Sequence, residues 1–175
     1  NTTAGEYDWI VNAFKLGRQY FSAQTKLMIN EYGIENTPGL NNRYADIIRL
    51  LKADGLVDVV GMQGHTFSTK KYGGTYTGLN NNLKSNLDNL AQLGLPIQIT
   101  EMDIEGDLYF NANGEQQEGG TNGQKDSFQL AEYQRIFNIY WNHPSVIGIT
   151  LWGWRPGLWQ NDAAAYLLDP CTGQE

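Results

Sequence analysis

The strongest constraint on the fold of this chain is an alternation, repeated four times, between a helical pattern and a short apolar run. Apolar residues at helical spacing predict helices over residues 7–21, 44–51, 79–90 and 130–141. The runs that follow predict strands over residues 26–30, 56–63, 97–101 and 146–152. Gly55 and Gly94 are the predicted stops of the second and third helices. The sequence therefore predicts an α/β protein.

The predicted strands are too apolar to leave one face in water, which favours a parallel sheet covered by helices. Two architectures have this layout, a doubly wound open sheet and a (β/α)₈ barrel. The glycine-rich phosphate loops that often accompany an open sheet, GxGxxG and GxxxxGK[ST], do not occur in the sequence. We therefore favour the barrel.

A barrel places functional side chains at the carboxyl ends of its strands, and these four strands end in such residues. The ends read Asn30-Glu31-Tyr32, Gln63-Gly64-His65, Glu101-Met102-Asp103 and Trp152-Gly153-Trp154. A complete barrel takes about 250 residues and eight strands. The 175 residues of this chain, with four strands, fit about half of one.

The strand period suggests how these ends converge. Side chains two positions apart share a face of a strand, so Glu101 and Asp103 should point the same way, as should Gln63 and His65. Acids, an imidazole, amides and indoles around one pocket are typical of sugar cleavage, because a carboxylate can attack an oxocarbenium-like centre while aromatic rings lie against the sugar.

Four segments resemble family 10 glycoside hydrolases, the retaining endo-1,4-β-xylanases, in the order that the family has. GLPIQITEMDI at 94–104 resembles the active-site signature, with Met102 where Leu, Ile or Tyr is usual. LMINEY at 27–32 is similar to an Asn-Asp-Tyr strand, with Glu31 in place of Asp, and VVGMQGH at 59–65 to a Gly-x-Gln-x-His strand. ITLWGWRPGLW at 149–159 resembles the last strand and loop, with altered spacing to its second tryptophan.

The resemblance implies a retaining double displacement. Glu101 would be the nucleophile, His65 would hydrogen-bond to Glu101, and Asp103 would hold the imidazole. No cofactor and no metal are implied. Xylan or a xylo-oligosaccharide would be the ligand, and the residues lining its cleft would be Asn30, Tyr32, Gln63, Trp152 and Trp159.

Retaining hydrolysis also needs an acid/base carboxyl group about 5–5.5 Å from the nucleophile. In the family this glutamate ends the fourth strand, which the resemblance places before Asn1. We therefore expect residues 1–175 to be the C-terminal part of a single barrel domain, strands five to eight, truncated at both ends. The expected partner is the N-terminal half of the barrel, and the chain alone is expected to be inactive.

Two alternatives from other classes remain open at this stage. A carbohydrate-binding fragment would stack xylan on Trp152 and Trp159, and a metal hydrolase would use His65, Glu101 and Asp103 as ligands. The net charge of −7 and pI near 4.8 argue against nucleic acid. No apolar run is long enough to span a membrane. The family resemblance implies an extracellular, cell-surface or periplasmic location.

Three further expectations concern packing and loops. By spacing, the core should include Tyr7, Tyr20, Phe137 and Trp141. The Gly-rich segment 106–126 is expected to be a substrate-side loop or disordered. His143, in Asn-His-Pro, is expected to be a turn residue.

Overall fold

The computed structural model describes residues 5–65, 76–107, 109–110, 116–117, 122–160 and 164–168. Its elements follow one another in the order α1 (Asp8–Tyr20), β1 (Met28–Glu31), α2 (Pro38–Ala53), β2 (Val59–Met62), α4 (Tyr76–Ala91), β3 (Ile97–Met102), β4 (Tyr109–Phe110), β5 (Gln116–Gln117), α5 (Asn122–Trp141) and β6 (Val146–Leu151). The four predicted strands and four predicted helices are confirmed.

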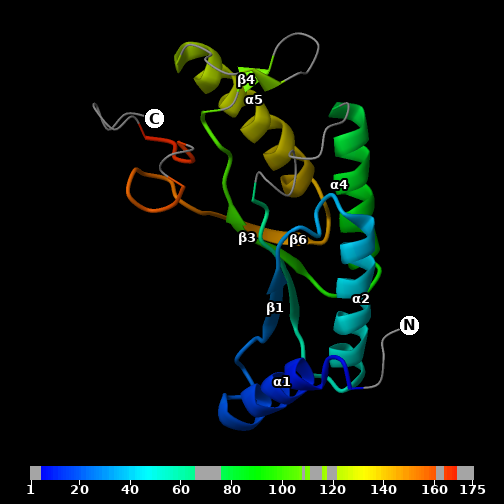
Figure 1. Ribbon diagram of the computed structural model, residues 1–175. Coiled ribbons are helices and arrows are strands. Elements are labelled where there is room, and N and C mark those ends of the chain that lie inside the picture. The colour runs from blue at the N-terminus through cyan, green and yellow to red at the C-terminus, as the bar shows by residue number, and fades with distance from the viewer. Residues whose placement is uncertain are drawn as a thin grey trace.

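The main sheet has the strand order β1-β2-β3-β6, and every neighbouring pair is parallel. Each strand therefore joins the main-sheet strand that precedes it in sequence, with a helix in between. Helices α2, α4 and α5 lie along one side of the sheet, and α1 lies at its lower end (Figure 1). The other side, which carries Asn30, Gln98, Thr100 and Thr150, is called the open face below.

The helices begin and end at residues suited to these positions. Pro38 opens α2, where its fixed φ and missing N–H cost nothing. The chain leaves α2 through Gly55 at φ +65° and α4 through Gly94 at φ +69°, left-handed conformations that glycine adopts without strain. The predicted stops at these two glycines are confirmed.

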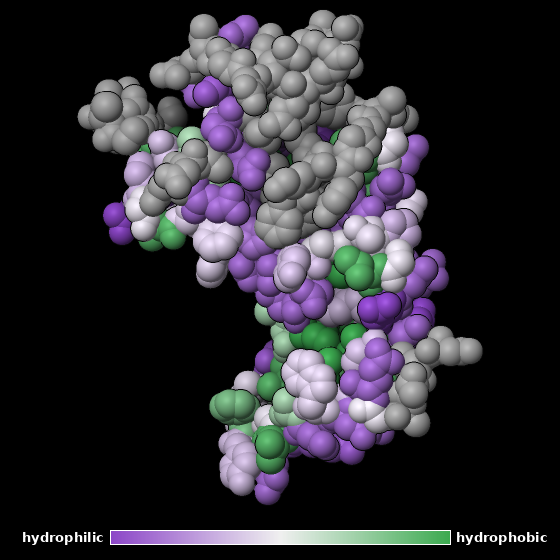
Figure 2. Space-filling view, in the orientation of Figure 1, coloured by the Kyte–Doolittle hydropathy of each residue, from purple (hydrophilic) through white to green (hydrophobic). Residues whose placement is uncertain are grey.

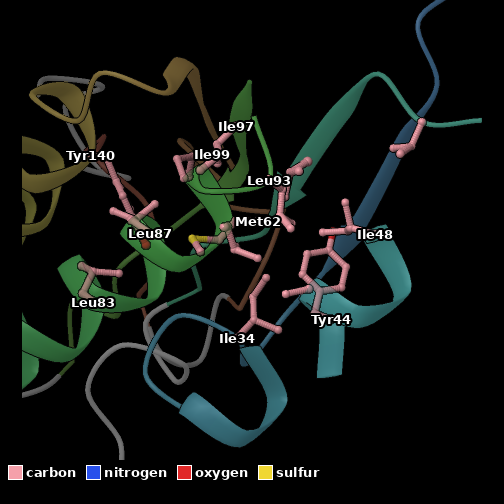
Figure 3. Packing of buried hydrophobic residues seen from close by; sticks show 14 of the residues in the cluster. Ile34, Tyr44, Ile48, Met62, Leu83, Leu87, Leu93, Ile97, Ile99 and Tyr140 are labelled. Atoms are coloured by element: carbon pink, nitrogen blue, oxygen red, sulfur yellow. The ribbon is translucent and has the colours of Figure 1, made fainter. Parts of the chain in front are cut away.

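The core lies between the helices and the covered side of the sheet (Figure 3). Leu83 and Leu87 of α4 pack there with Met62, Ile97 and Ile99 from the strands. Burial of such aliphatic side chains is the main force that holds helices on a sheet, at about 25 cal/mol per Å² of apolar surface.

Two sets of side-chain hydrogen bonds hold β1 and β2 in place. The Tyr44 hydroxyl lies 2.8 Å from the carbonyl oxygens of both Ile29 and Gly61, and its one proton can go to either. The Asp58 carboxylate accepts from the Leu27 N–H at 2.7 Å and from the Arg18 guanidinium at 2.6 Å. These two donors hold the pKa of Asp58 below its usual value.

Two expectations about loops need correction. Helix α5 begins at Asn122, within the segment predicted to be a loop, and the described parts of that segment also pair as the antiparallel strands β4 and β5. His143 is more than a turn residue, because its buried ring lies 3.2 Å from Asp88 of α4. The Asn-His-Pro turn is therefore fastened to the neighbouring helix.

The predicted burial of the aromatic residues on α1 and α5 is largely wrong. Tyr20 is 76% exposed, Trp141 66% and Phe137 37%, and Tyr7 is only half-buried. Apolar side chains are visible at the lower end of the molecule, where α1 lies (Figure 2). Helical spacing shows which residues share a face, but it does not show whether another element covers that face.

Candidate active site

The candidate site lies just past the carboxyl ends of β2 and β3. His65 follows β2 by three residues, and Glu101 lies at the end of β3 with Asp103 beyond it. His65 and Asp103 form one further parallel backbone bridge after the two strands have ended. The sheet itself therefore sets the separation of these two residues.

An irregularity in β3 brings Glu101 to the open face. Strict alternation from the buried Ile97 and Ile99 would place residue 101 on the side of the helices. The pairing with β6 shifts between Ile99 and Met102, where three steps along β3 match two along β6. A bulge of this kind re-aims side chains. Met102 is buried in the core, and Glu101 turns to the open face.

The two carboxylates approach opposite nitrogens of one imidazole. His65 Nδ1 lies 2.5 Å from Asp103 Oδ1, and His65 Nε2 lies 3.3 Å from Glu101 Oε2. His65 and Asp103 are buried, whereas the Glu101 side chain keeps 20% of its surface exposed. Burial by itself lowers the pKa of His65, but hydrogen bonds and charge from Asp103 and Glu101 outweigh it and raise that pKa above its usual value.

Both oxygens of Asp103 accept a hydrogen bond. While Oδ1 faces His65, Oδ2 accepts from the Trp159 indole N–H at 3.0 Å. The Trp159 ring also lies 5.6 Å from the imidazole, centroid to centroid, tilted by 30°. Asp103 therefore connects the strand ends to the loop that follows β6.

Glu101 has a second partner across the sheet. The Asn30 side-chain amide at the end of β1 donates to Glu101 Oε1 at 3.1 Å, and the Thr100 hydroxyl donates to Asn30 Oδ1 at 2.9 Å. With Oε2 facing His65, each carboxylate oxygen of Glu101 has its own nitrogen partner. The direction of this carboxylate is therefore well defined.

The other predicted ligand contacts, Gln63, Tyr32 and Trp152, lie at the ends of β2, β1 and β6. Gln63 is half-buried, and its carbonyl accepts from the Glu101 N–H at 2.9 Å. Tyr32 is 54% exposed just past β1, and Trp152 is 43% exposed after β6. Trp152 meets Trp159 at 72°, with 6.5 Å between centroids. These two indoles therefore do not form one flat platform for successive sugars.

The sequence reasoning missed Glu35, which lies in the loop after β1. This carboxylate is fully buried and accepts from the Gly64 N–H at 2.7 Å, next to His65. Gly64 has φ +82°, and a Cβ there would lie 2.9 Å from Ile99 Cγ2. An acid between Ile34 and Asn36, four residues after the end of β1, is the signal that could have indicated this residue.

The geometry does not favour the metal alternative. Because Glu101 and Asp103 approach opposite ring nitrogens of His65, they cannot share one ion with it. Within the described ranges, no three His, Cys, Asp or Glu side chains are grouped as a metal would require.

In the same ranges, no helix has the length and hydropathy of a membrane span.

Parallel strands that join the sheet in sequence order, with helices between them and a polar site at their carboxyl ends, are the layout of a (β/α)-barrel domain. The chain belongs to glycosyl hydrolase family 10, whose family profile matches residues 1–170. The GH10 structures that it resembles are (β/α)₈ barrels, and this sheet corresponds to about half of one.

Individual relatives agree with this assignment. Endo-1,4-beta-xylanase B of Cellvibrio japonicus is 34% identical over 152 residues, which cover 86% of this chain and 20% of that protein. Endo-1,4-beta-xylanase B of Thermotoga neapolitana is 32% identical over 151 residues, covering 82% and 38%.

Among solved structures, the GH10 protein of Paenibacillus barcinonensis has a TM-score of 0.67 at 25% identity, covering 98% of this chain and 45% of that one. The Clostridium thermocellum endo-1,4-beta-D-xylanase 10B, solved as CBM22-1 and GH10 modules with xylohexaose, has a TM-score of 0.71 at 26% identity, covering 97% and 31%. This chain thus spans less than half of each of these relatives.

Proposed function

We propose that this chain supplies the nucleophile half of a retaining endo-1,4-β-xylanase, with Glu101 as the nucleophile. The observation that carries the proposal is the carboxylate of Glu101, oriented by Asn30 and by His65 at the carboxyl ends of the parallel strands. The family and the xylohexaose complex of the Clostridium thermocellum protein support xylan as the substrate.

The proposed reaction has two steps. Glu101 attacks the anomeric carbon, an ester bond forms as the glycosidic bond breaks, and a second carboxyl group protonates the leaving oxygen. That group then removes a proton from water, which attacks the anomeric carbon and frees Glu101. Trp152 and Trp159 would pack against the sugar, and Gln63 and Tyr32 would border the cleft.

Among the described carboxylates at the strand ends, none is suited to be the second acid. Both carboxylate oxygens of Asp103 already have hydrogen-bond partners, His65 and Trp159. The Glu31 side chain is exposed and accepts from the Tyr32 N–H. We therefore propose that the acid/base group comes from the N-terminal half of the barrel, contributed by the same parent protein or a separate chain.

The exposed apolar residues support such a partner. The edge strands of the sheet are β1 and β6, and the adjoining helices α1 and α5 each carry an exposed apolar row at the same spacing. The rows are Trp9, Leu16 and Tyr20 on α1, and Leu130, Phe137 and Trp141 on α5. A half barrel that pairs with both edges and covers both rows would close the sheet.

The test compares Glu101→Gln with Glu31→Gln in the complete catalytic domain, where Glu31 is an exposed carboxylate at the end of β1. Release of reducing sugar from xylan should fall below detection for Glu101→Gln and persist for Glu31→Gln. Full activity of Glu101→Gln would refute the role of nucleophile.

The chain expressed alone should release no reducing sugar, because none of its described carboxylates at the strand ends is suited to be the second acid. Activity of the isolated chain that Glu101→Gln abolishes would refute the need for a partner. The extracellular, cell-surface or periplasmic location stays a prediction. The xylanase TsXylA of Thermoanaerobacterium saccharolyticum, a structural relative at 25% identity, is described as intracellular.

A further inference from the structure

Four residues that pair in register across the open face form a row in which side-chain amides alternate with glycines. Asn30 of β1 pairs with Gly61 of β2, which pairs with Gln98 of β3, which pairs with Gly148 of β6. A Cβ on Gly61 would lie 2.6 Å from Asn30 Oδ1, and one on Gly148 would lie 2.7 Å from Gln98 Oε1. Each amide therefore lies flat over the glycine of the next strand, in space that any side chain would fill.

The direction of the Asn30 amide follows from its neighbours. An ionised carboxylate only accepts hydrogen bonds, so the Asn30 atom 3.1 Å from Glu101 Oε1 must be the NH₂ nitrogen. The oxygen then faces Thr100, whose hydroxyl must donate across the 2.9 Å to Oδ1. The carbonyl of Met62 is the other acceptor in reach, at the longer distance of 3.5 Å.

We propose that Thr100 is a positioning residue for Glu101 and acts through Asn30. By donating to Oδ1, the Thr100 hydroxyl prevents the amide from rotating by 180°, which would turn an oxygen towards the carboxylate. Gly61 provides the room in which the amide lies. Oε1 of Glu101 is then held by Asn30 while Oε2 faces His65. This inference rests on the proposed function, since it assigns a role in orienting the nucleophile.

The second amide in the row supplies a matched control. Gln98 Nε2 donates to the Thr150 hydroxyl at 3.4 Å, so Thr150 also contacts an amide of this row, as an acceptor where Thr100 is a donor. Neither Gln98 nor Thr150 has a described contact with Glu101. Thr150→Val therefore removes a hydroxyl from the same face of the sheet without touching the proposed chain of hydrogen bonds.

The first measurement is the rate at which Glu101 is labelled by a 2-fluoro-xylobioside with a dinitrophenolate leaving group, in the complete catalytic domain. A bond forms between Glu101 and the anomeric carbon as dinitrophenolate departs as an anion, so the step needs no acid and reports on the nucleophile. Thr100→Val should slow labelling about tenfold at saturating reagent, with little change in the concentration for half-maximal rate. Thr100→Ser and Thr150→Val should stay within about twofold of the wild type, the first because it keeps the hydroxyl.

Labelling of Thr100→Val at the wild-type rate would overturn the proposal, as would equal slowing by Thr150→Val. Circular dichroism checks folding, and Thr100→Ala, which removes the hydroxyl without adding volume, replaces Thr100→Val if that variant does not fold.

The second measurement separates this proposal from the proposed function. The side-chain amide protons of Asn30 are followed by ¹H–¹⁵N NMR in the same variants. Their resonances should shift in Thr100→Val and keep their positions in Thr100→Ser and Thr150→Val. If the wild type is not labelled on Glu101, the proposed function fails, and the NMR result alone decides on Thr100. Unchanged Asn30 resonances in Thr100→Val would then overturn its role.

Discussion

Replacing Asp103 by Asn tests the reasoning about the site most directly. Asp103 is buried, and its two oxygens accept from His65 at 2.5 Å and from Trp159 at 3.0 Å. An asparagine has only one acceptor oxygen, so one of these two buried donors must lose its partner. Losing a hydrogen bond to a charged group costs about 1.5–3 kcal/mol. We expect Asp103→Asn to lower the free energy of unfolding by about 2 kcal/mol at pH 6.

The size of this loss should depend on pH. The pKa of His65 is raised in the folded protein, so the charged imidazole stabilises the fold fully below its unfolded pKa of about 6.5. This contribution is lost as the pH rises through the folded pKa. Once the pH lies above the folded pKa the imidazole is neutral, and the cost of the substitution should shrink to about 1 kcal/mol, that of an ordinary hydrogen bond.

¹H–¹⁵N NMR of the His65 ring follows its titration and locates the folded pKa. Urea denaturation of the complete domain at pH 6 and at a pH above that pKa then measures both values. The pKa of His65 should fall in Asp103→Asn because its main hydrogen-bond acceptor is weakened. A difference in unfolding free energy that is equal at both pH values, with an unchanged His65 titration, would refute the reasoning.

Two further stability predictions use the same denaturation assay. Gly64→Ala should cost about 2 kcal/mol more than Gly55→Ala, because both positions have positive φ but only the first would place its Cβ against a buried isoleucine. Equal costs would contradict the clash at Gly64. Asp58→Asn should lower the free energy of unfolding by about 2 kcal/mol at pH 7, since it weakens the hydrogen bonds that the carboxylate accepts from an arginine and a backbone N–H. The pKa of Asp58 is lowered, so this cost should fade as the pH falls below about 4 and through that pKa, and a cost that persists in strong acid would speak against an ionic origin.

Much of the fold could be predicted because its signals are local. Helical spacing, apolar runs and the glycines at 55 and 94 each lie within a few residues, and all of the main helices and strands formed where they indicated. The start of α5 was missed because a Gly-rich composition hides helical spacing. The exposure of Tyr20 and Trp141 was missed because burial depends on what packs from outside.

The site was harder to predict than the fold. Family motifs pointed to Glu101, His65 and Asp103, and the structure brings these three side chains together. Strand period alone would have turned Glu101 towards the helices, because the bulge between Ile99 and Met102 leaves no signature in the apolar pattern. Glu35 was missed for a related reason, since its partner is a backbone N–H, which a sequence does not display.

The backbone bridge between His65 and Asp103 has a consequence for engineering. This backbone bridge sets the spacing of the imidazole and its carboxylate. The chain downstream of each residue can therefore be lengthened, shortened or exchanged while that spacing is kept. Grafting new binding segments after these two positions is therefore a route to altered polysaccharide preference in which the reacting groups stay in place.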